Sequence, residues 1–193
     1  MKLSNRQLEI IQAATKLIGE KGIQNLTTKN LAAEIGFSEA ALYRHFKNKN
    51  IIIGSILEYY KDEIKDVMSD IVKKNNSGIE KLKNVIEFLF NRFLKNPAIV
   101  MIVFAETSFQ NEVQLSDQVH SILKQKKKIF EDVILIGQKD GSIRNDIQKE
   151  QLATIFMGSL RLTVLRWRLT NLSFDLKKEG KALWLALEKI FMK

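Results

Sequence analysis

The residues whose types and spacing point most directly to a function lie between positions 28 and 46. Two short helices that cross at a steep angle need a small residue where they touch, and Ala32 supplies it. The sharp turn between them needs a positive φ, which costs Gly36 little. Apolar residues at matching offsets would form a small core between the helices: Leu31, Ile35, Phe37 and Leu42. The pattern predicts a helix-turn-helix whose second helix, residues 38–45, brings its N-terminal residues to base edges in the DNA major groove. The alternative is that two short helices simply pack in an all-helical core.

Residues typical of enzyme active sites are scarce. The chain has no cysteine and two histidines, which excludes cysteine-based zinc sites, iron–sulfur clusters and thiol catalysis. The sequence lacks a glycine-rich phosphate loop, a His-Glu-x-x-His motif and a nucleophile elbow. His120 has no metal-ligand neighbour at helical spacing, and no pattern marks a catalytic Asp/Glu pair. We therefore expect a protein that is not an enzyme and that needs no cofactor or metal.

Helices must position these residues, because helical patterns run along nearly the whole chain of 193 residues. A single proline and nine glycines argue against a sheet-rich fold, which needs many turns. Helix-capping residues precede four of the expected helices: Ser4, Thr27, Ser38 and Asn48. The sequence predicts an all-α fold of about nine helices, with later helices near residues 78–95, 97–104, 113–138, 148–171 and 175–192.

The charge distribution favours an anionic partner for the N-terminal part. The net charge is +9, and residues 1–50 contribute eight basic and four acidic side chains. Such an excess permits polyanion binding without identifying it. We interpret the lysine run at 124–128 as a solvated helix face. No uncharged apolar stretch approaches the ~18–20 residues that span a bilayer, and the N-terminal residues lack a signal-peptide core, so we expect a cytoplasmic protein without membrane association.

Residues 27–49 resemble the DNA-binding signature of the tetracycline-repressor (TetR) family. The Leu-Tyr-Arg-His-Phe-x-x-Lys core at residues 42–49 is highly specific, and the similarity extends from about Arg6 to Leu57. Two positions depart from the family pattern: Phe37 stands where valine is common, and Asn50 stands where glutamate usually follows the lysine. The resemblance implies a dimeric transcriptional regulator with an N-terminal three-helix DNA-binding domain, residues 1–48. A larger helical domain for ligand binding and dimerisation, residues 49–193, would follow.

The resemblance also implies roles in DNA binding by position. Phosphate contacts are expected at the start of one helix from Thr27, Thr28 and Lys29, where free N–H groups favour an anion. Base edges would be faced by Ser38, Glu39, Ala40 and Ala41, and backbone contacts would come from Tyr43, His45 and Lys49. Arg44 would reach either a phosphate or a guanine. Glu39 would either accept a hydrogen bond from a cytosine amino group or act as a solvated acid that weakens nonspecific binding.

The last two helices are apolar around most of their circumference, and such a helix must be covered on more than one side. A two-fold interface would cover them, as the resemblance implies, while burial within one subunit is the alternative. The expected interface residues are Ile155, Gly158, Ser159, Leu162, Trp167, Leu183, Trp184, Leu187 and Phe191.

A dry, adaptable ligand pocket would be lined by aromatic and methionine side chains. The candidates are Phe88, Phe93, Met101, Phe104, Phe109, Phe130, Phe156 and Met157. Each of them taken singly is more often plain core. Arg161 and Arg168 share a helix face, where they would bind an acidic ligand, pair with Glu179 or Glu188, or face water; the last two are favoured.

Together with these residues, the resemblance implies a homodimeric, sequence-specific repressor that binds a palindromic operator in double-stranded DNA. A largely apolar small-molecule effector would release it. The alternative is an interaction protein of the same fold that acts mainly through a protein partner, with DNA binding secondary.

Overall fold

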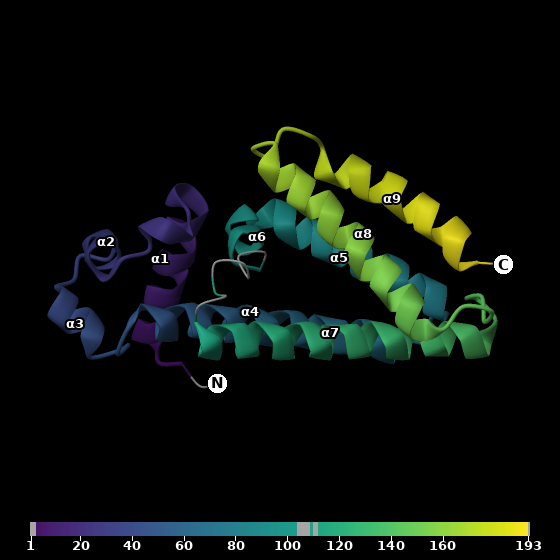
Figure 1. Cartoon of the computed structure of the whole chain (residues 1–193), viewed down its shortest axis with the longest axis horizontal. Coiled ribbons are helices and arrows are strands. Elements are labelled where there is room, and N and C mark those ends of the chain that lie inside the picture. Colours follow the sequence, from purple (N-terminus) through teal and green to yellow (C-terminus); the bar gives the residue numbers. More distant parts are fainter. Residues whose placement is uncertain (1–2, 104–108, 110–111, 193) are drawn as a thin grey trace. The chain divides into compact units, whose positions relative to one another are not determined.

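The computed structural model describes residues 3–103, 109 and 112–192, and of residues 101–103 it describes the backbone only. Within these residues the chain forms nine α-helices and no strand, as predicted (Figure 1). The helices are α1 (Asn5–Lys21), α2 (Thr28–Glu34), α3 (Glu39–Tyr43), α4 (Lys49–Lys73), α5 (Gly78–Lys95), α6 (Pro97–Val103), α7 (Val113–Asp140), α8 (Lys149–Leu169) and α9 (Leu176–Phe191). A short 3₁₀ turn, η1 (Ile23–Asn25), lies between α1 and α2. None of the described helices is both long and apolar enough to cross a membrane.

The chain divides into two compact units. The first holds the described residues of Met1–Ile64 and Asn96–His120, and the second holds the described residues of Lys65–Lys95 and Ser121–Lys193. Helices α4 and α7 therefore each contribute residues to both units. The functional boundary expected after residue 48 stays a prediction.

Local capping explains where the first helices of the first unit begin. The Ser4 hydroxyl accepts a hydrogen bond from the backbone N–H of Gln7, and the Gln7 side chain accepts one from the N–H of Ser4. This capping box satisfies two N–H groups that the helix itself leaves unpaired. The Thr27 and Ser38 hydroxyls accept from the N–H groups of Asn30 and Ala41 at the starts of α2 and α3. These three caps are where the sequence predicted them.

Helices α2 and α3 form the predicted helix-turn-helix. Gly36 has φ of 68° in the turn, and Phe37 donates its N–H to the Ala32 carbonyl oxygen at 2.8 Å. Leu31 and Leu42 are completely buried in the core between the helices. The prediction that Ile35 and Phe37 complete this core is only partly met, because both side chains are half-exposed.

Helix α6 packs against α1 in the same unit at very short range. A Cβ added to Gly19 of α1 would lie 2.5 Å from the Cβ of Ala98 in α6. Real Cβ atoms do not approach this closely, so glycine at this position permits the contact. The helical interior is otherwise an unfavourable place for glycine.

In the second unit, α9 packs against both α5 and α8 (Figure 1). An aromatic core is formed by Phe130 of α7, Phe156 of α8 and Phe191 of α9. The ring centroids of Phe130 and Phe156 lie 5.1 Å apart, and those of Phe156 and Phe191 lie 6.2 Å apart. These distances lie in the range of favourable aromatic pairs. A Cβ on Gly180 of α9 would lie 2.0 Å from the Phe90 ring of α5, so that glycine permits the close crossing of α5 and α9.

Polar groups fix the corner where α5 begins. The Asp140 carboxylate accepts hydrogen bonds from the N–H groups of Gly78 at 2.8 Å and Ser142 at 2.9 Å. Burial opposes the charged form of Asp140, but the hydrogen bonds from Ser142 and Gly78 outweigh it and hold the pKa of this carboxyl below its ordinary value. The buried Lys81 ammonium donates to the carbonyl oxygens of Lys74 and Asn76, which terminate α4. This corner therefore caps the end of one helix and the start of the next.

Candidate DNA-binding surface

Helix α3 has one anchored face and one exposed face. Leu42 points into the core, whereas Ser38, Glu39, Ala40, Tyr43 and Arg44 are exposed. Ala41 and His45 are half-buried. Of the seven residues in 38–45 that were assigned to base or backbone contacts, five are therefore exposed and two are half-buried, while the residue assigned to the core is buried.

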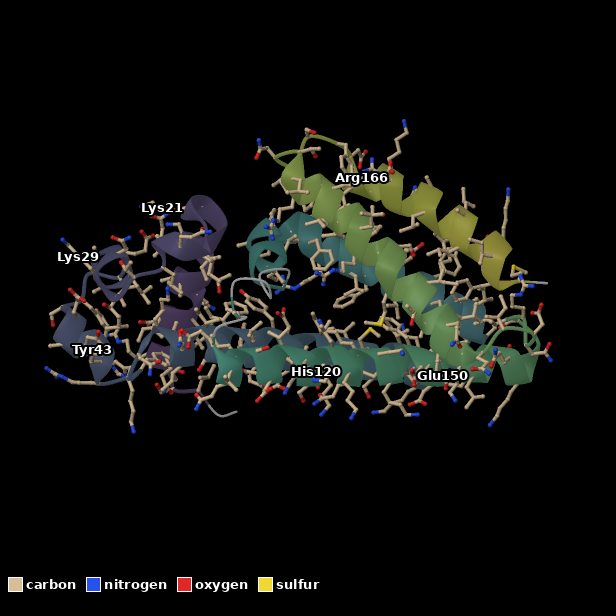
Figure 2. All side chains as sticks on the ribbon, in the orientation of Figure 1. Lys21, Lys29, Tyr43, His120, Glu150 and Arg166 are labelled. Carbon is tan, nitrogen blue, oxygen red and sulfur yellow. The ribbon has the colours of Figure 1, made fainter. Side chains whose placement is uncertain are left out.

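The start of α2 lies close to the start of α3. Thr28 Oγ1 donates a hydrogen bond to Glu39 Oε2 at 2.6 Å. The neighbouring Thr27 hydroxyl instead accepts from the Asn30 N–H at 3.1 Å. Lys29 is exposed, and Figure 2 shows it at the same end of the unit as Tyr43. The structure therefore brings the predicted phosphate contacts of α2 together with the predicted readout helix.

The first turn of α1 supports the end of α3 through residues that the sequence reasoning missed. The Arg6 guanidinium lies 5.0 Å from the centroid of the Phe37 ring, and the Phe37 and His45 rings are 6.4 Å apart. Gln7 Nε2 donates to the His45 carbonyl oxygen at 3.4 Å. The larger ring at position 37, where the family pattern favours valine, thus lies beside both the Arg6 guanidinium and the His45 ring. The phenylalanine at position 37 was the one feature of the sequence that pointed to this contact.

The start of α4 presents Lys49 and is held by the start of α7 in the same unit. Lys49 is exposed, and the Asn48 side chain caps α4 by accepting from the Ile51 N–H at 3.0 Å. Asn50 Nδ2 donates to Glu112 Oε2 at 2.7 Å. The second family departure, at Asn50, therefore marks a contact between α4 and the residue that precedes α7.

A second polar contact joins α7 to α4 one turn further along. Gln118 Nε2 donates to the Gly54 carbonyl oxygen at 2.9 Å and to Glu58 Oε1 at 3.1 Å. Burial opposes the charged form of Glu58, but hydrogen bonds from Lys61 and Gln118 outweigh it and keep the pKa of this carboxyl below its ordinary value. No pattern of residue spacing along the chain predicts this contact between α4 and α7.

The residues expected at a dimer interface divide into two groups. Ile155 and Leu162 of α8 are 41% and 59% exposed, Gly158 is exposed, and Ser159 is half-buried. In α9, Leu183 is half-buried. The remaining four are buried inside their own unit: Trp167, Trp184, Leu187 and Phe191. Among the residues expected at the interface, those of α8 other than Trp167 are therefore the ones open to a second subunit, and Leu169 of the same helix is also exposed.

The residues expected to line a ligand pocket also divide. Phe93, Phe130 and Phe156 are buried in the second unit, where Phe88 and Met157 are half-buried. Phe109 is buried in the first unit. Phe104 and the side chain of Met101 lie outside the described residues. Glu179, one expected partner of Arg161 or Arg168, pairs with Arg166 at 3.5 Å.

Two family models together cover most of the chain. Residues 10–56 match the model of bacterial regulatory proteins of the tetR family, and residues 57–188 match that of the YsiA-like protein C-terminal region. The chain is 27% identical over 169 residues to the nucleoid occlusion factor SlmA of Photobacterium profundum, which covers 76% of this chain and 86% of the relative. It is 23% identical over 171 residues to the fatty acid metabolism regulator protein of Bacillus subtilis, covering 89% and 88%.

Solved structures share the fold over nearly the whole chain. The fatty acid degradation regulator FadR of Bacillus halodurans superposes with a TM-score of 0.87 at 20% identity, covering 97% of both chains. FadR of Bacillus subtilis in complex with stearoyl-CoA superposes with a TM-score of 0.83 at 22% identity, covering 93% of this chain and 96% of that one. With its signature motif, its helix-turn-helix and two family models along its length, this chain belongs to the TetR family of DNA-binding transcription regulators.

Proposed function

We propose that this protein is a homodimeric repressor that binds a palindromic operator and leaves it when a small molecule binds. The observation that carries the proposal is the division of α3 into the buried Leu42 and an exposed face with Glu39, Tyr43 and Arg44. A short helix anchored in this way can enter the major groove while its neighbours contact the backbone. The basic side chains around it, Lys29 and Lys49, supply the sequence-independent part of the affinity.

Lys49 and Tyr43 are both assigned to DNA phosphates. Substituting each residue in turn distinguishes a charged phosphate contact from a neutral one. Lys49→Ala is expected to weaken binding to all sequences and to reduce the slope of log K against log salt by about one, because one fewer counterion is released. Tyr43→Phe removes only a hydroxyl, so affinity should fall with the salt slope unchanged. Fluorescence anisotropy of a labelled duplex over a salt series measures both quantities. Equal slopes for Lys49→Ala and the unmodified protein would remove Lys49 from the phosphate contacts.

The dimer is proposed to form through an exposed stripe of α8. Ile155, Leu162 and Leu169 recur every seven residues on one helix face, and Leu169 is 68% exposed. Gly158 lies on the same face with no described atom within 4 Å of an added Cβ, so a partner helix could approach closely. Two subunits joined in this way would present two recognition helices, and a spacing of about 34 Å between them matches one DNA turn.

Leu162→Glu is expected to convert the dimer to a monomer, because a carboxylate would be buried against an apolar partner surface without a counter-charge. Sedimentation velocity at several protein concentrations measures the change. Leu123→Glu on α7 is the matched control, since Leu123 is also an exposed leucine. A dimer that survives Leu162→Glu would require another interface.

The effector is proposed to be a long-chain fatty acyl thioester. Two similarities support this class: one to the fatty acid metabolism regulator protein of Bacillus subtilis, and one to a FadR whose structure contains stearoyl-CoA. An apolar chain also suits a domain rich in phenylalanine and methionine. Stearoyl-CoA would release the protein from DNA only if it binds the non-DNA-binding state more tightly, since equal affinity for both states shifts nothing.

Selection of bound duplexes from a random pool at about 150 mM salt, which suppresses nonspecific binding, tests the proposal as a whole. We expect an enriched palindrome from which stearoyl-CoA, but not free CoA, releases the protein. The second candidate function is that of an interaction protein with secondary DNA binding, which the similarity to nucleoid occlusion factors favours. Weak, sequence-indifferent binding in the selection would support that candidate instead.

A further inference from the structure

The hydrogen bond between Thr28 and Glu39 links the first residues of two different helices. Thr28 begins α2 and Glu39 begins α3, eleven residues later, and their side-chain oxygens are 2.6 Å apart. Glu39 is exposed, and Thr28 is half-buried. Both side chains lie on the surface that is proposed to meet DNA, one among the expected phosphate contacts and the other among the expected base contacts.

The Thr28 hydroxyl has one proton, and only one acceptor can hold it at a time. An ionised carboxylate and a DNA phosphate both accept hydrogen bonds and cannot donate them. While Thr28 donates to Glu39, it cannot donate to a phosphate. Thr27 differs, because its oxygen accepts from the Asn30 N–H and its proton stays available. Before DNA binds, the Thr28 hydroxyl proton is therefore already engaged, whereas the proton of the adjacent Thr27 can be donated to a phosphate.

Where DNA displaces water from the Glu39 carboxylate, this residue can give up the Thr28 hydroxyl at low cost only if another donor replaces it. In the major groove, cytosine presents the N4 amino group and adenine the N6 amino group. Guanine presents the acceptors N7 and O6, and thymine presents the acceptor O4 and a methyl group. A carboxylate would be repelled by those acceptors and would keep its bond to Thr28. An exocyclic amino group is thus the chemistry that could take the place of the Thr28 hydroxyl.

We propose that Glu39 prevents the Thr28 hydroxyl from donating to a DNA phosphate until the exocyclic amino group of a base replaces that hydroxyl as the donor to Glu39. The pair then couples recognition of one base to one phosphate contact, so that a matched site gains both contacts and a mismatched site gains neither. This inference rests on the proposed function, since it requires the surface of α2 and α3 to bind operator DNA.

The test compares Thr28→Val on two duplexes: the operator enriched by the full-length protein, and the same duplex with one base pair inverted in each half-site, which moves its amino group to the other strand. That position is the one at which Glu39→Ala loses base preference in the selection. On the matched duplex, Thr28→Val is expected to weaken binding about tenfold, because a hydrogen bond to a charged phosphate is lost. On the mismatched duplex it should change affinity less than twofold, because Glu39 already holds the hydroxyl.

The matched control is the same comparison in a Glu39→Ala background, where the hydroxyl is free on both duplexes. Thr28→Val should then cost the same factor, about tenfold, on each. Thr28→Ser, which keeps the hydroxyl, should behave like the unmodified protein, and circular dichroism verifies that every variant is folded. An equal cost of Thr28→Val on both duplexes in the presence of Glu39 would overturn the inference alone. If the unmodified protein enriched no sequence, the proposed function and this inference would fall together.

Discussion

Leu42→Ala is expected to abolish sequence-specific DNA binding and to lower the free energy of unfolding by about 2–5 kcal/mol. Leu42 is 0% exposed and is the only buried residue among the five described residues of α3. A helix of this length has no stability of its own in water, so its position depends on tertiary packing. Truncation of its one buried side chain should leave the exposed contacts without a fixed orientation. Urea denaturation and anisotropy with the selected duplex measure the two effects.

Two further variants separate packing from a general loss of structure. Leu42→Met conserves volume and should cost less than about 1.5 kcal/mol, with specific binding retained. Leu94→Ala on α5 truncates a leucine that is 38% exposed, and its effect on unfolding should be small. Specific binding by a folded Leu42→Ala protein at the affinity of the unmodified protein would show that α3 does not depend on this anchor.

Gly180→Ala is expected to destabilise the second unit by about 1–3 kcal/mol, although alanine is the better helix former. The new methyl group would lie 2.0 Å from Cδ2 and 2.4 Å from Cε2 of Phe90. Phe90 is 4% exposed, so its ring is enclosed by protein. Helices α5 and α9 must therefore separate or the ring must leave its rotamer. For a chain of this length each kcal/mol lowers Tm by about 2–4 °C, which calorimetry can measure.

Gly158→Ala is the matched control, since it is a helical glycine in the same unit with no described atom within 4 Å of an added Cβ. At protein concentrations low enough to give monomers, this substitution should stabilise the chain by up to about 1 kcal/mol through helix propensity. Stabilisation by Gly180→Ala to the same extent would mean that α5 and α9 do not approach as closely as the Phe90 contact indicates.

The sequence by itself determined the features that depend on neighbouring residues. Ser4, Thr27 and Ser38 cap the helices that follow them because each hydroxyl accepts a hydrogen bond from a backbone N–H three residues later. Gly36 adopts φ of 68° at the turn where a positive φ was expected. Interactions that close over so few residues have the same partners in any fold, so the residue types alone were enough to predict the helix-turn-helix.

The direction in which the apolar residues of α8 and α9 point depended on the tertiary structure. Both helices are apolar on several sides, so periodicity could not separate the core from a surface. The structure buries Trp167 and Trp184 and exposes Leu162 and Leu169. Hydrophobic burial is non-directional, and the packing of neighbouring helices decides which face of such a helix is covered.

The contacts most informative about function were also decided by the tertiary structure. Thr28 meets Glu39 across eleven residues, and Gln118 meets Gly54 across sixty-four. The sequence analysis did not single out Gly180, because the need for a glycine there comes from the ring of Phe90 on another helix. Partners so far apart along the chain meet only after the path of the backbone is fixed, because hydrogen bonds and steric contacts act over a few ångströms.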